Sequence, residues 1–307
     1  MIAVDSLCRT FGSFTAVDDV TFTALPGRVT GFLGPNGAGK STTMRIVVGL
    51  TQATSGTATV SGRRYIDLPN PGREVGVLLD ASAQHAGRTG RETLTIAQRL
   101  IGAPRHRVDQ LLGLVDLSPS EAARRVGDYS LGMRQRLGIA TALVGDPNIL
   151  ILDEPANGLD PAGMRWMRDL LRDHADRGGT VLLSSHLLHE IEVLADDLVV
   201  ISKGRVVAQG SKRDLLRSAC TLVRTADRRG LASTLSRSGI TSAPRGHDGL
   251  LAHADTTTVG TVTAAAGIAL SELRPADGSG LEQMFLDLTA TSERDSAGSI
   301  EQGGEAA

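Results

Sequence analysis

The chain of 307 residues is 41% hydrophobic, which is enough for about two domains with packed cores. Its 32 basic residues stand against 34 acidic ones, so no positive field attracts nucleic acid or anionic lipid, and we expect no nucleic-acid partner. The sequence shows neither a signal-type apolar core nor a run near the roughly 20 apolar residues of a membrane span, which predicts a cytoplasmic chain without direct membrane insertion. Cys8 and Cys220 are too few for a disulfide framework or a metal cluster.

From residue 1 to about 211, short apolar runs alternate with helical stretches, the pattern of an α/β domain built on a mostly parallel sheet. Between about 81 and 142 the strand signals vanish and apolar residues recur at helical spacing. We therefore expect a sheet domain over 1–215 that carries an inserted helical subdomain. Its buried strands are predicted at 28–33, 149–152, 180–183 and 198–201.

The composition changes after Lys212, where alanine, threonine and serine become frequent. A weak strand at 221–224 and a helix at 230–237 predict a small α+β domain over 219–290. Near its end, an apolar helical stripe should pack this domain; it consists of Leu281, Met284, Phe285 and Leu288. Residues 291–307 are small and polar apart from Ile300, which predicts a disordered tail.

The octapeptide 34–41, Gly-Pro-Asn-Gly-Ala-Gly-Lys-Ser, fits the Gly-x-x-x-x-Gly-Lys-Ser/Thr pattern of a phosphate-binding loop. Glycines let backbone N–H groups surround phosphate oxygens, and the helix that follows adds its positive N-terminal end. Lys40 supplies a mobile cation and Ser41 a magnesium ligand. A nucleoside triphosphate should bind here, held by Gly34, Pro35, Asn36, Gly37, Ala38, Gly39, Lys40, Ser41 and Thr42.

A second group of polar residues follows the strand predicted at 149–152. Asp153 is placed to hold magnesium through water, and Glu154 to polarise the water that attacks the γ-phosphate. Pro155-Ala156-Asn157-Gly158-Leu159-Asp160-Pro161 comes next, and Ser184-Ser185-His186 follows the next strand. The order His186-x-x-His189-Glu190 lacks the i, i+4 histidine pair of a zinc-protease helix, so we expect no zinc site.

This ordered set resembles the ABC-type ATPases, P-loop proteins whose subunits bind ATP in pairs. The stretch 129–136, Tyr-Ser-Leu-Gly-Met-Arg-Gln-Arg, resembles their signature motif imperfectly, because Leu131 and Met133 depart from it. The resemblance implies that Ser130 and Gly132 contact the ATP of the partner subunit. It also implies that His186 touches the γ-phosphate, and Asp160 belongs to the same nucleotide-binding set.

Two further positions follow from the resemblance. Phe11 lies where the family carries an aromatic that stacks on adenine, just before the first strands, and Phe14 is the alternative. Asp80 stands where the family usually has a glutamine that touches magnesium and the attacking water. A carboxylate can still ligate magnesium, but it is shorter and cannot donate a hydrogen bond, so we expect a coupling residue with a reduced catalytic share. The alternative is a loop aspartate in solvent.

Asp80, the signature variant and residues 281–289 look like the drug-export branch, which includes the daunorubicin- and bacitracin-resistance subunits. The resemblance implies a homodimer that hydrolyses ATP with Mg²⁺ and is peripheral on the inner face of the cell membrane. There it would drive a separately encoded permease that exports a drug, antibiotic or lipid-like compound. One alternative is a soluble ABC ATPase that acts as a clamp in translation or DNA maintenance, and another is a regulator with weak turnover.

The sequence weighs against both alternatives. A soluble clamp usually has two ATPase domains in one chain or a long coiled-coil insertion, and this sequence shows neither. A weak-turnover regulator is disfavoured by the intact set of Lys40, Asp153, Glu154 and His186.

Overall fold

The computed structural model describes residues 1–217, 221–246, 249–276, 281 and 285. The chain divides into two compact units, Met1–Gln209 and Gly210–Ala307. The tail predicted at 291–307 lies outside the described residues, as do Met284, Leu288 and Cys220. Leu281, from the predicted stripe, is fully buried.

A six-stranded sheet with the order β5-β6-β7-β3-β8-β9 forms the centre of the first unit. The pairs that link β5, β6, β7, β3 and β8 are parallel. All four residues of β6 are buried, as expected for a parallel strand covered on both faces. The strands are β3 (Arg28–Leu33), β5 (Val75–Leu78), β6 (Ile149–Leu152), β7 (Thr180–Ser184), β8 (Asp197–Ser202) and β9 (Arg205–Ser211).

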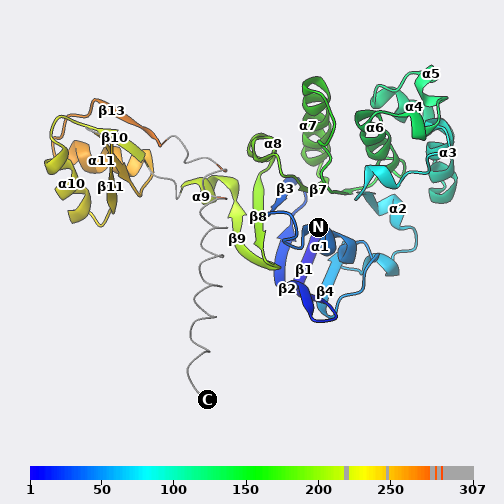
Figure 1. Ribbon diagram of the computed structural model, residues 1–307, viewed down its shortest axis with the longest axis horizontal. Helices are drawn as coiled ribbons and strands as arrows, with labels where there is room; N and C mark the ends of the chain where they lie inside the picture. The colour runs from blue at the N-terminus through cyan, green and yellow to red at the C-terminus, as the bar shows by residue number, and fades with distance from the viewer. Residues whose placement is uncertain (218–220, 247–248, 277–280, 282–284, 286–307) are drawn as a thin grey trace, which may run out of the picture. The chain divides into compact units, whose positions relative to one another are not determined.

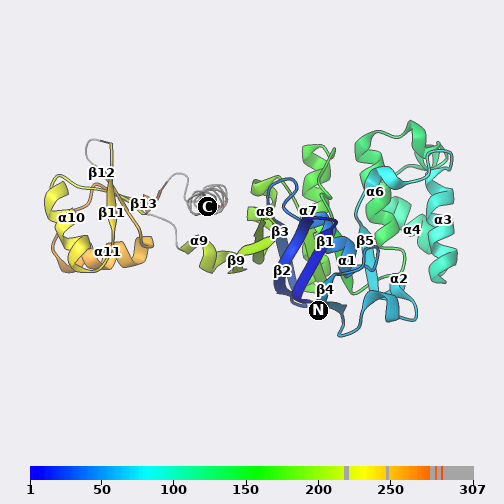
Figure 2. The same cartoon turned by 60° about the horizontal axis from the view of Figure 1, so that its bottom comes forward.

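The N-terminal strands form a separate antiparallel sheet with the order β2-β1-β4. Its strands are β1 (Ile2–Phe11), β2 (Phe14–Ala24) and β4 (Ser55–Val60). Only two residues connect β1 to β2, and so short a connection permits only antiparallel pairing (Figure 2). The predicted mostly parallel sheet therefore does not extend to the N-terminus, and Phe11 ends β1 instead of preceding the first strands.

The two sheets of the first unit share one apolar core. Phe22 of β2 and Phe32 of β3 stack with ring centroids 5.2 Å apart, which joins the antiparallel sheet to the parallel one. The helices of this part of the unit are α1 (Lys40–Val47), α2 (Pro71–Glu74), α7 (Pro161–Asp176) and α8 (Leu188–Leu194).

Four helices between β5 and β6 gather beside the sheets of the first unit (Figure 1). They are α3 (Gly90–Ile101), α4 (Arg107–Leu114), α5 (Pro119–Ala122) and α6 (Leu131–Ala142). Residues 81–142, all of which the structure describes, contain no strand. Thr89 and Ser118 begin α3 and α5 with capping boxes, so polar side chains satisfy the first backbone N–H groups of these helices.

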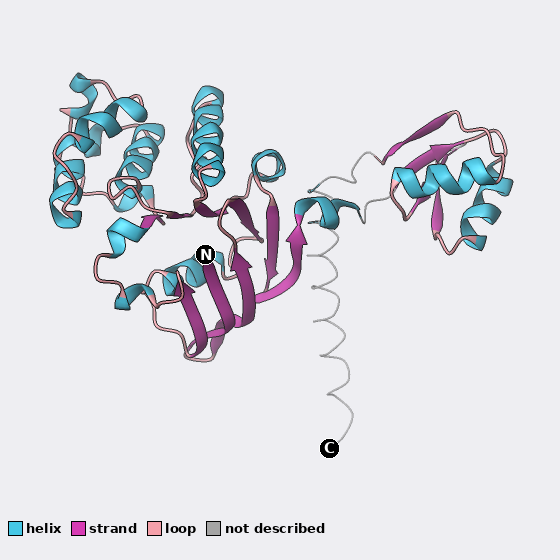
Figure 3. Cartoon of the chain, turned by 180° about the vertical axis from the view of Figure 1, so that it is seen from behind, coloured by secondary structure: helices cyan, strands magenta, loops and turns pink. Residues whose placement is uncertain are grey.

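The second unit has the element order β-α-β-β-α-β after the short helix α9 (Lys212–Arg217). Its antiparallel sheet has the order β11-β12-β10-β13. Figure 3 shows the helices of this unit, in cyan, beside its strands, in magenta. The core of this unit includes Val223, Leu231, Leu235, Leu250 and Val259. Its elements are β10 (Thr221–Arg224), α10 (Arg228–Arg237), β11 (Ser242–Arg245), β12 (Gly249–Ala252), α11 (Thr256–Ala265) and β13 (Glu272–Pro275). Within the described parts of both units, every helix falls short of the length and apolar character needed to cross a membrane.

Candidate active site

The predicted phosphate loop connects β3 to the N-terminus of α1. Gly39 directly precedes α1 with φ of 105°, a left-handed conformation that disfavours any residue with a Cβ. A Cβ at Gly39 would also lie 2.5 Å from the carbonyl oxygen of Ala16. A glycine is therefore required at this position by both the backbone conformation and the space beside it.

Lys40 is a buried cation at the start of α1, with 7% of its surface exposed. Its Nζ donates hydrogen bonds to the carbonyl oxygens of Gly34 at 2.6 Å and Pro35 at 3.2 Å. Burial lowers the pKa of Lys40, and the nearby charges of Glu154 and Asp153 act in the opposite direction. A hydrogen bond from an ammonium group to a phosphate is stronger than one to a neutral carbonyl oxygen. Lys40 should therefore exchange these carbonyl contacts for a phosphate when a nucleotide binds to this loop.

Ser41 and Asp153 meet at the end of the sheet where α1 begins. Ser41 Oγ donates to Asp153 Oδ2 at 2.6 Å, and Ser184 Oγ donates to Asp153 Oδ1. Mg²⁺ takes hydroxyl and carboxylate oxygens as ligands, usually together with water and substrate phosphates. The described residues contain no group of three or more His, Cys, Asp or Glu side chains that could hold a metal alone. The pair therefore fits a magnesium ion that nucleotide and water help to hold.

Glu154 and His186 lie against each other at the ends of neighbouring strands. The Nδ1 atom of His186 lies 2.7 Å from Glu154 Oε2, and the backbone N–H of His186 donates to the same oxygen at 3.2 Å. The ring and the backbone N–H of His186 thus orient one carboxylate oxygen of Glu154. The side chain of Glu154 is 23% exposed, so it is held by the protein and still open to solvent.

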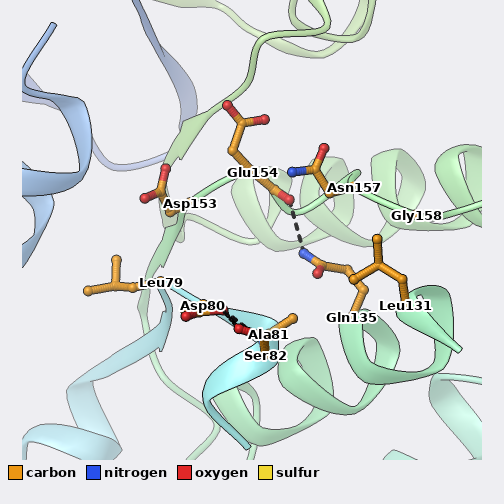
Figure 4. A pocket seen from close by; sticks show the side chains of 10 residues that line it. All are labelled: Leu79, Asp80, Ala81, Ser82, Leu131, Gln135, Asp153, Glu154, Asn157 and Gly158. Carbon is orange, nitrogen blue, oxygen red and sulfur yellow. Dashed lines mark hydrogen bonds between the residues drawn. The ribbon is translucent and has the colours of Figure 1, made fainter. Parts of the chain in front are cut away.

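A pocket of about 350 Å³ opens beside these carboxylates (Figure 4). It brings together side chains from the end of β5, from α6 and from the loop that follows β6. Its lining residues are Leu79, Asp80, Ala81, Ser82, Leu131, Gln135, Asp153, Glu154, Asn157 and Gly158.

Asp80 lines this pocket, although one of its oxygens serves a local turn. Its Oδ1 accepts hydrogen bonds from Ser82 N at 2.7 Å and from Ser82 Oγ at 2.6 Å. The hydroxyl and backbone donors of Ser82, with a smaller contribution from the charge of Arg45, lower the pKa of Asp80 and keep the carboxylate ionised. Asp80 is exposed, as the solvent alternative expected, and it is also near Asp153 and Glu154, as the coupling interpretation expected.

The remaining predicted residues make local contacts. Ser130 Oγ accepts from Met133 N at 3.2 Å and thereby caps α6, which begins with Leu131 and Gly132. Asp160 Oδ1 accepts from Gly163 N at 2.8 Å and caps α7. Phe11 is 47% exposed, and the guanidinium carbon of Arg9 lies 4.3 Å from its ring centroid.

Two side chains that the sequence did not single out hold the backbone of Glu154. Ser184 Oγ accepts from Glu154 N at 3.1 Å, and Gln135 Nε2 donates to Glu154 O at 3.0 Å. Both residues belong to stretches named from the sequence, but 30 and 19 residues separate them from Glu154. No local pattern predicts contacts over such separations.

The parallel sheet, the glycine loop before α1 and the acidic pair after β6 define a P-loop nucleotide-binding protein. Residues 17–157 match the family described as ABC transporter. The chain is 40% identical over 212 residues to the bacitracin transport ATP-binding protein BcrA of Bacillus licheniformis, covering 68% of this chain and 69% of that protein. The chain is also 40% identical over 196 residues to the uncharacterized ABC transporter ATP-binding protein YhcH of Bacillus subtilis. That alignment covers 63% of this chain and 64% of YhcH, so the chain spans just under two thirds of that relative's length.

A solved ATP-binding subunit of an ABC transporter has the same fold, with a TM-score of 0.65, 28% identity, and coverage of 71% of this chain and 92% of that one. The chain therefore belongs to the ABC transporter ATP-binding proteins, and it is an ABC-type ATPase. Both the resemblance and the P-loop fold predicted from the sequence are confirmed.

Proposed function

We propose that this chain is the ATP-hydrolysing subunit of an ABC efflux transporter, in which two copies bind two ATP molecules and drive a separate membrane permease. The observation that carries the proposal is the pairing of Ser41 with Asp153 and of Glu154 with His186 around one sheet edge. These pairs supply what phosphoryl transfer to water needs, namely a metal site and an oriented base.

Each residue has a separate task in the proposed hydrolysis. Lys40 turns from the loop carbonyls to the β- and γ-phosphates, while Ser41 and Asp153 hold the magnesium ion, which neutralises phosphate charge when bound. Glu154 accepts a proton from the attacking water. His186 fixes one oxygen of Glu154 and leaves the other for the water. Asp80 lines the same pocket as Asp153 and Glu154 and couples nucleotide binding to the membrane partner.

The partners in this proposal follow from the signature segment and from the relatives. Residues 129–136 resemble the signature motif and include the N-terminus of α6, which suits an anion, so we assign this helix end to the ATP held by the second copy. A relative named for bacitracin transport favours an antibiotic or a lipid-like compound as the exported substrate. The unit from Gly210 onward is then an accessory domain, and the subunit works at the cytoplasmic face of the membrane.

The test is affinity purification of the Glu154→Gln variant from gently solubilised source cells in ATP and Mg²⁺, followed by mass spectrometry. Loss of the base should leave ATP binding intact and prolong the ATP-bound dimer. The matched control is Lys40→Ala, which removes the phosphate-binding cation and should recover much less partner.

A multi-span membrane protein at matching stoichiometry, enriched with Glu154→Gln over Lys40→Ala, supports the exporter. Ribosomal proteins or nucleic acid without a permease would instead establish the soluble clamp in translation or DNA maintenance.

A further inference from the structure

The backbone of Glu154 has a conformation that is uncommon for a residue other than glycine. Its φ is 51°, in the left-handed region that is disfavoured for any residue with a Cβ. Such a conformation persists only where surrounding groups hold it in place, and it tends to occur at functional sites. The groups that hold Glu154 therefore decide where its carboxylate points.

Two buried side chains hold the backbone of Glu154 from opposite ends. Ser184, fully buried on β7, accepts the N–H of Glu154 at 3.1 Å. Gln135, which is 3% exposed on α6, donates to the carbonyl oxygen of Glu154 at 3.0 Å (Figure 4). The N–H of Asn157 donates to the same carbonyl oxygen at 3.2 Å, so a local turn contributes as well.

Ser184 also connects Glu154 to the metal-binding pair. Its hydroxyl donates to Asp153 Oδ1, while Asp153 Oδ2 accepts from Ser41 Oγ at 2.6 Å. A continuous chain of hydrogen bonds thus runs from Ser41 through Asp153 and Ser184 to the backbone of Glu154. Any shift of Ser184 would disturb the two carboxylates together.

Gln135 connects Glu154 to a different element. It lies one turn into α6, the helix that Ser130 caps. A rotation of α6 would move the amide of Gln135 and, through it, the peptide of Glu154. Helix α6 would therefore present Ser130 and Gly132 to the nucleotide of the second copy and, through Gln135, orient Glu154 toward the nucleotide of its own chain.

We propose that Gln135, together with Ser184, is a positioning residue that holds the strained backbone of Glu154 and ties the base to the signature helix α6. The inference rests on the proposed function, because it concerns a base only if the chain hydrolyses ATP. Neither residue needs to touch the nucleotide.

The experiment compares Gln135→Met with Gln98→Met in the full chain. Gln98 is another buried glutamine of the helical subdomain, 8% exposed, and its Nε2 also donates to a backbone carbonyl, that of Ala103. Each substitution removes one buried amide donor at nearly constant volume, so folding stability should fall similarly. We expect kcat to fall roughly 10- to 100-fold for Gln135→Met alone, with KM and ATP affinity unchanged, because a base slightly out of place loses rate rather than binding.

A second comparison tests whether Gln135 acts through Glu154. In the Glu154→Gln background, adding Gln135→Met should lower the residual single-turnover rate no further, since the base is already gone. Ser184→Ala should lower kcat as Gln135→Met does. Ser184→Thr keeps the hydroxyl, so its kcat should stay close to that of the parent chain.

The outcomes separate the two proposals. If the parent chain failed to hydrolyse ATP, the proposed function and this inference would fall together. If the parent hydrolyses ATP and Gln135→Met turns over as fast as Gln98→Met, only the positioning role is wrong. An additive loss in the Glu154→Gln background would overturn it as well.

Discussion

The aromatic side chains on either side of the β1–β2 turn differ in exposure and in partners. Phe11 is 47% exposed with Arg9 beside its ring, whereas Phe14, directly across the hairpin, is 63% exposed. We expect Phe11→Ala to weaken ATP binding by about 1–3 kcal/mol, the range found when a base loses its aromatic stacking partner. Phe14→Ala should change the affinity little. Fluorescent-nucleotide titration of both variants measures this, and a larger loss for Phe14→Ala would transfer the adenine contact to that residue.

His174 is a buried histidine of α7 outside the nucleotide site. It is 7% exposed, and its Nε2 has no partner in the described part of the chain. Burial lowers the pKa of His174, helped by the charge of Arg177 and opposed by a backbone hydrogen bond to Asn148 and the charge of Asp146. In the unfolded chain the His174 imidazole therefore binds a proton near the ordinary pKa of about 6.5, whereas in the folded chain it binds that proton only at a lower pH. The stability that His174 contributes is present above about pH 6.5 and is lost as the pH falls below that value.

This linkage predicts a difference between the parent chain and His174→Gln that depends on pH. The parent should lose up to about 1.4 kcal/mol more unfolding free energy than the variant per pH unit below 6.5, since one proton is involved. Urea unfolding at pH 7.5 and 5.5 tests it. A stability difference that stayed constant between the two pH values would show that His174 does not titrate on unfolding.

At the scale of elements, the N-terminus of α6 and the loop before α7 fit each other closely. Gly158 has φ of 73°, and a Cβ there would overlap the side chain of Leu131. Leucine at this signature position is thus accommodated by a glycine in the neighbouring loop. We expect Gly158→Ala to destabilise the protein by about 2 kcal/mol, through left-handed strain and overpacking combined, and to slow ATP turnover.

Adding Leu131→Gly should recover about half of that loss, because it removes the overlap and leaves the backbone strain. Thermal unfolding of the single and double variants measures the recovery. A double variant no more stable than Gly158→Ala would mean that the two residues are not coupled.

The elements differ in how well the sequence predicts them. Strands β3 and β6 match the predicted runs residue for residue, because strands buried on both faces read as continuous apolar segments. Strands β1 and β4 carry no such run, and register shifts interrupt their pairing, so the sequence pattern does not predict the antiparallel sheet. The site shows the same division: the loop motif identified Lys40 and Ser41, whereas the contacts of Ser184 and Gln135 with Glu154 arise only when distant segments fold together.

At the scale of the whole molecule, two apolar cores form from separate parts of the chain. The first runs from Ile2 to Ile201, and the second from Val223 to Val259. Every residue assigned here to nucleotide binding or hydrolysis belongs to the first unit, Met1–Gln209. Since each unit has its own core and is of ordinary domain size, the two should fold independently.

A protein that ends at Arg217 should therefore bind ATP with an affinity within about twofold of the full chain, a free-energy change of about 0.4 kcal/mol. Nucleotide titration of the shortened and full-length proteins at equal Mg²⁺ measures this, with Lys40→Ala in both as the control for specific binding. Because the first core is complete without the second unit, its thermal midpoint should also stay within a few degrees. A shortened protein that keeps its midpoint but loses ATP affinity would show that the second unit supports the nucleotide site. Loss of both would mean that the two units form one cooperative fold.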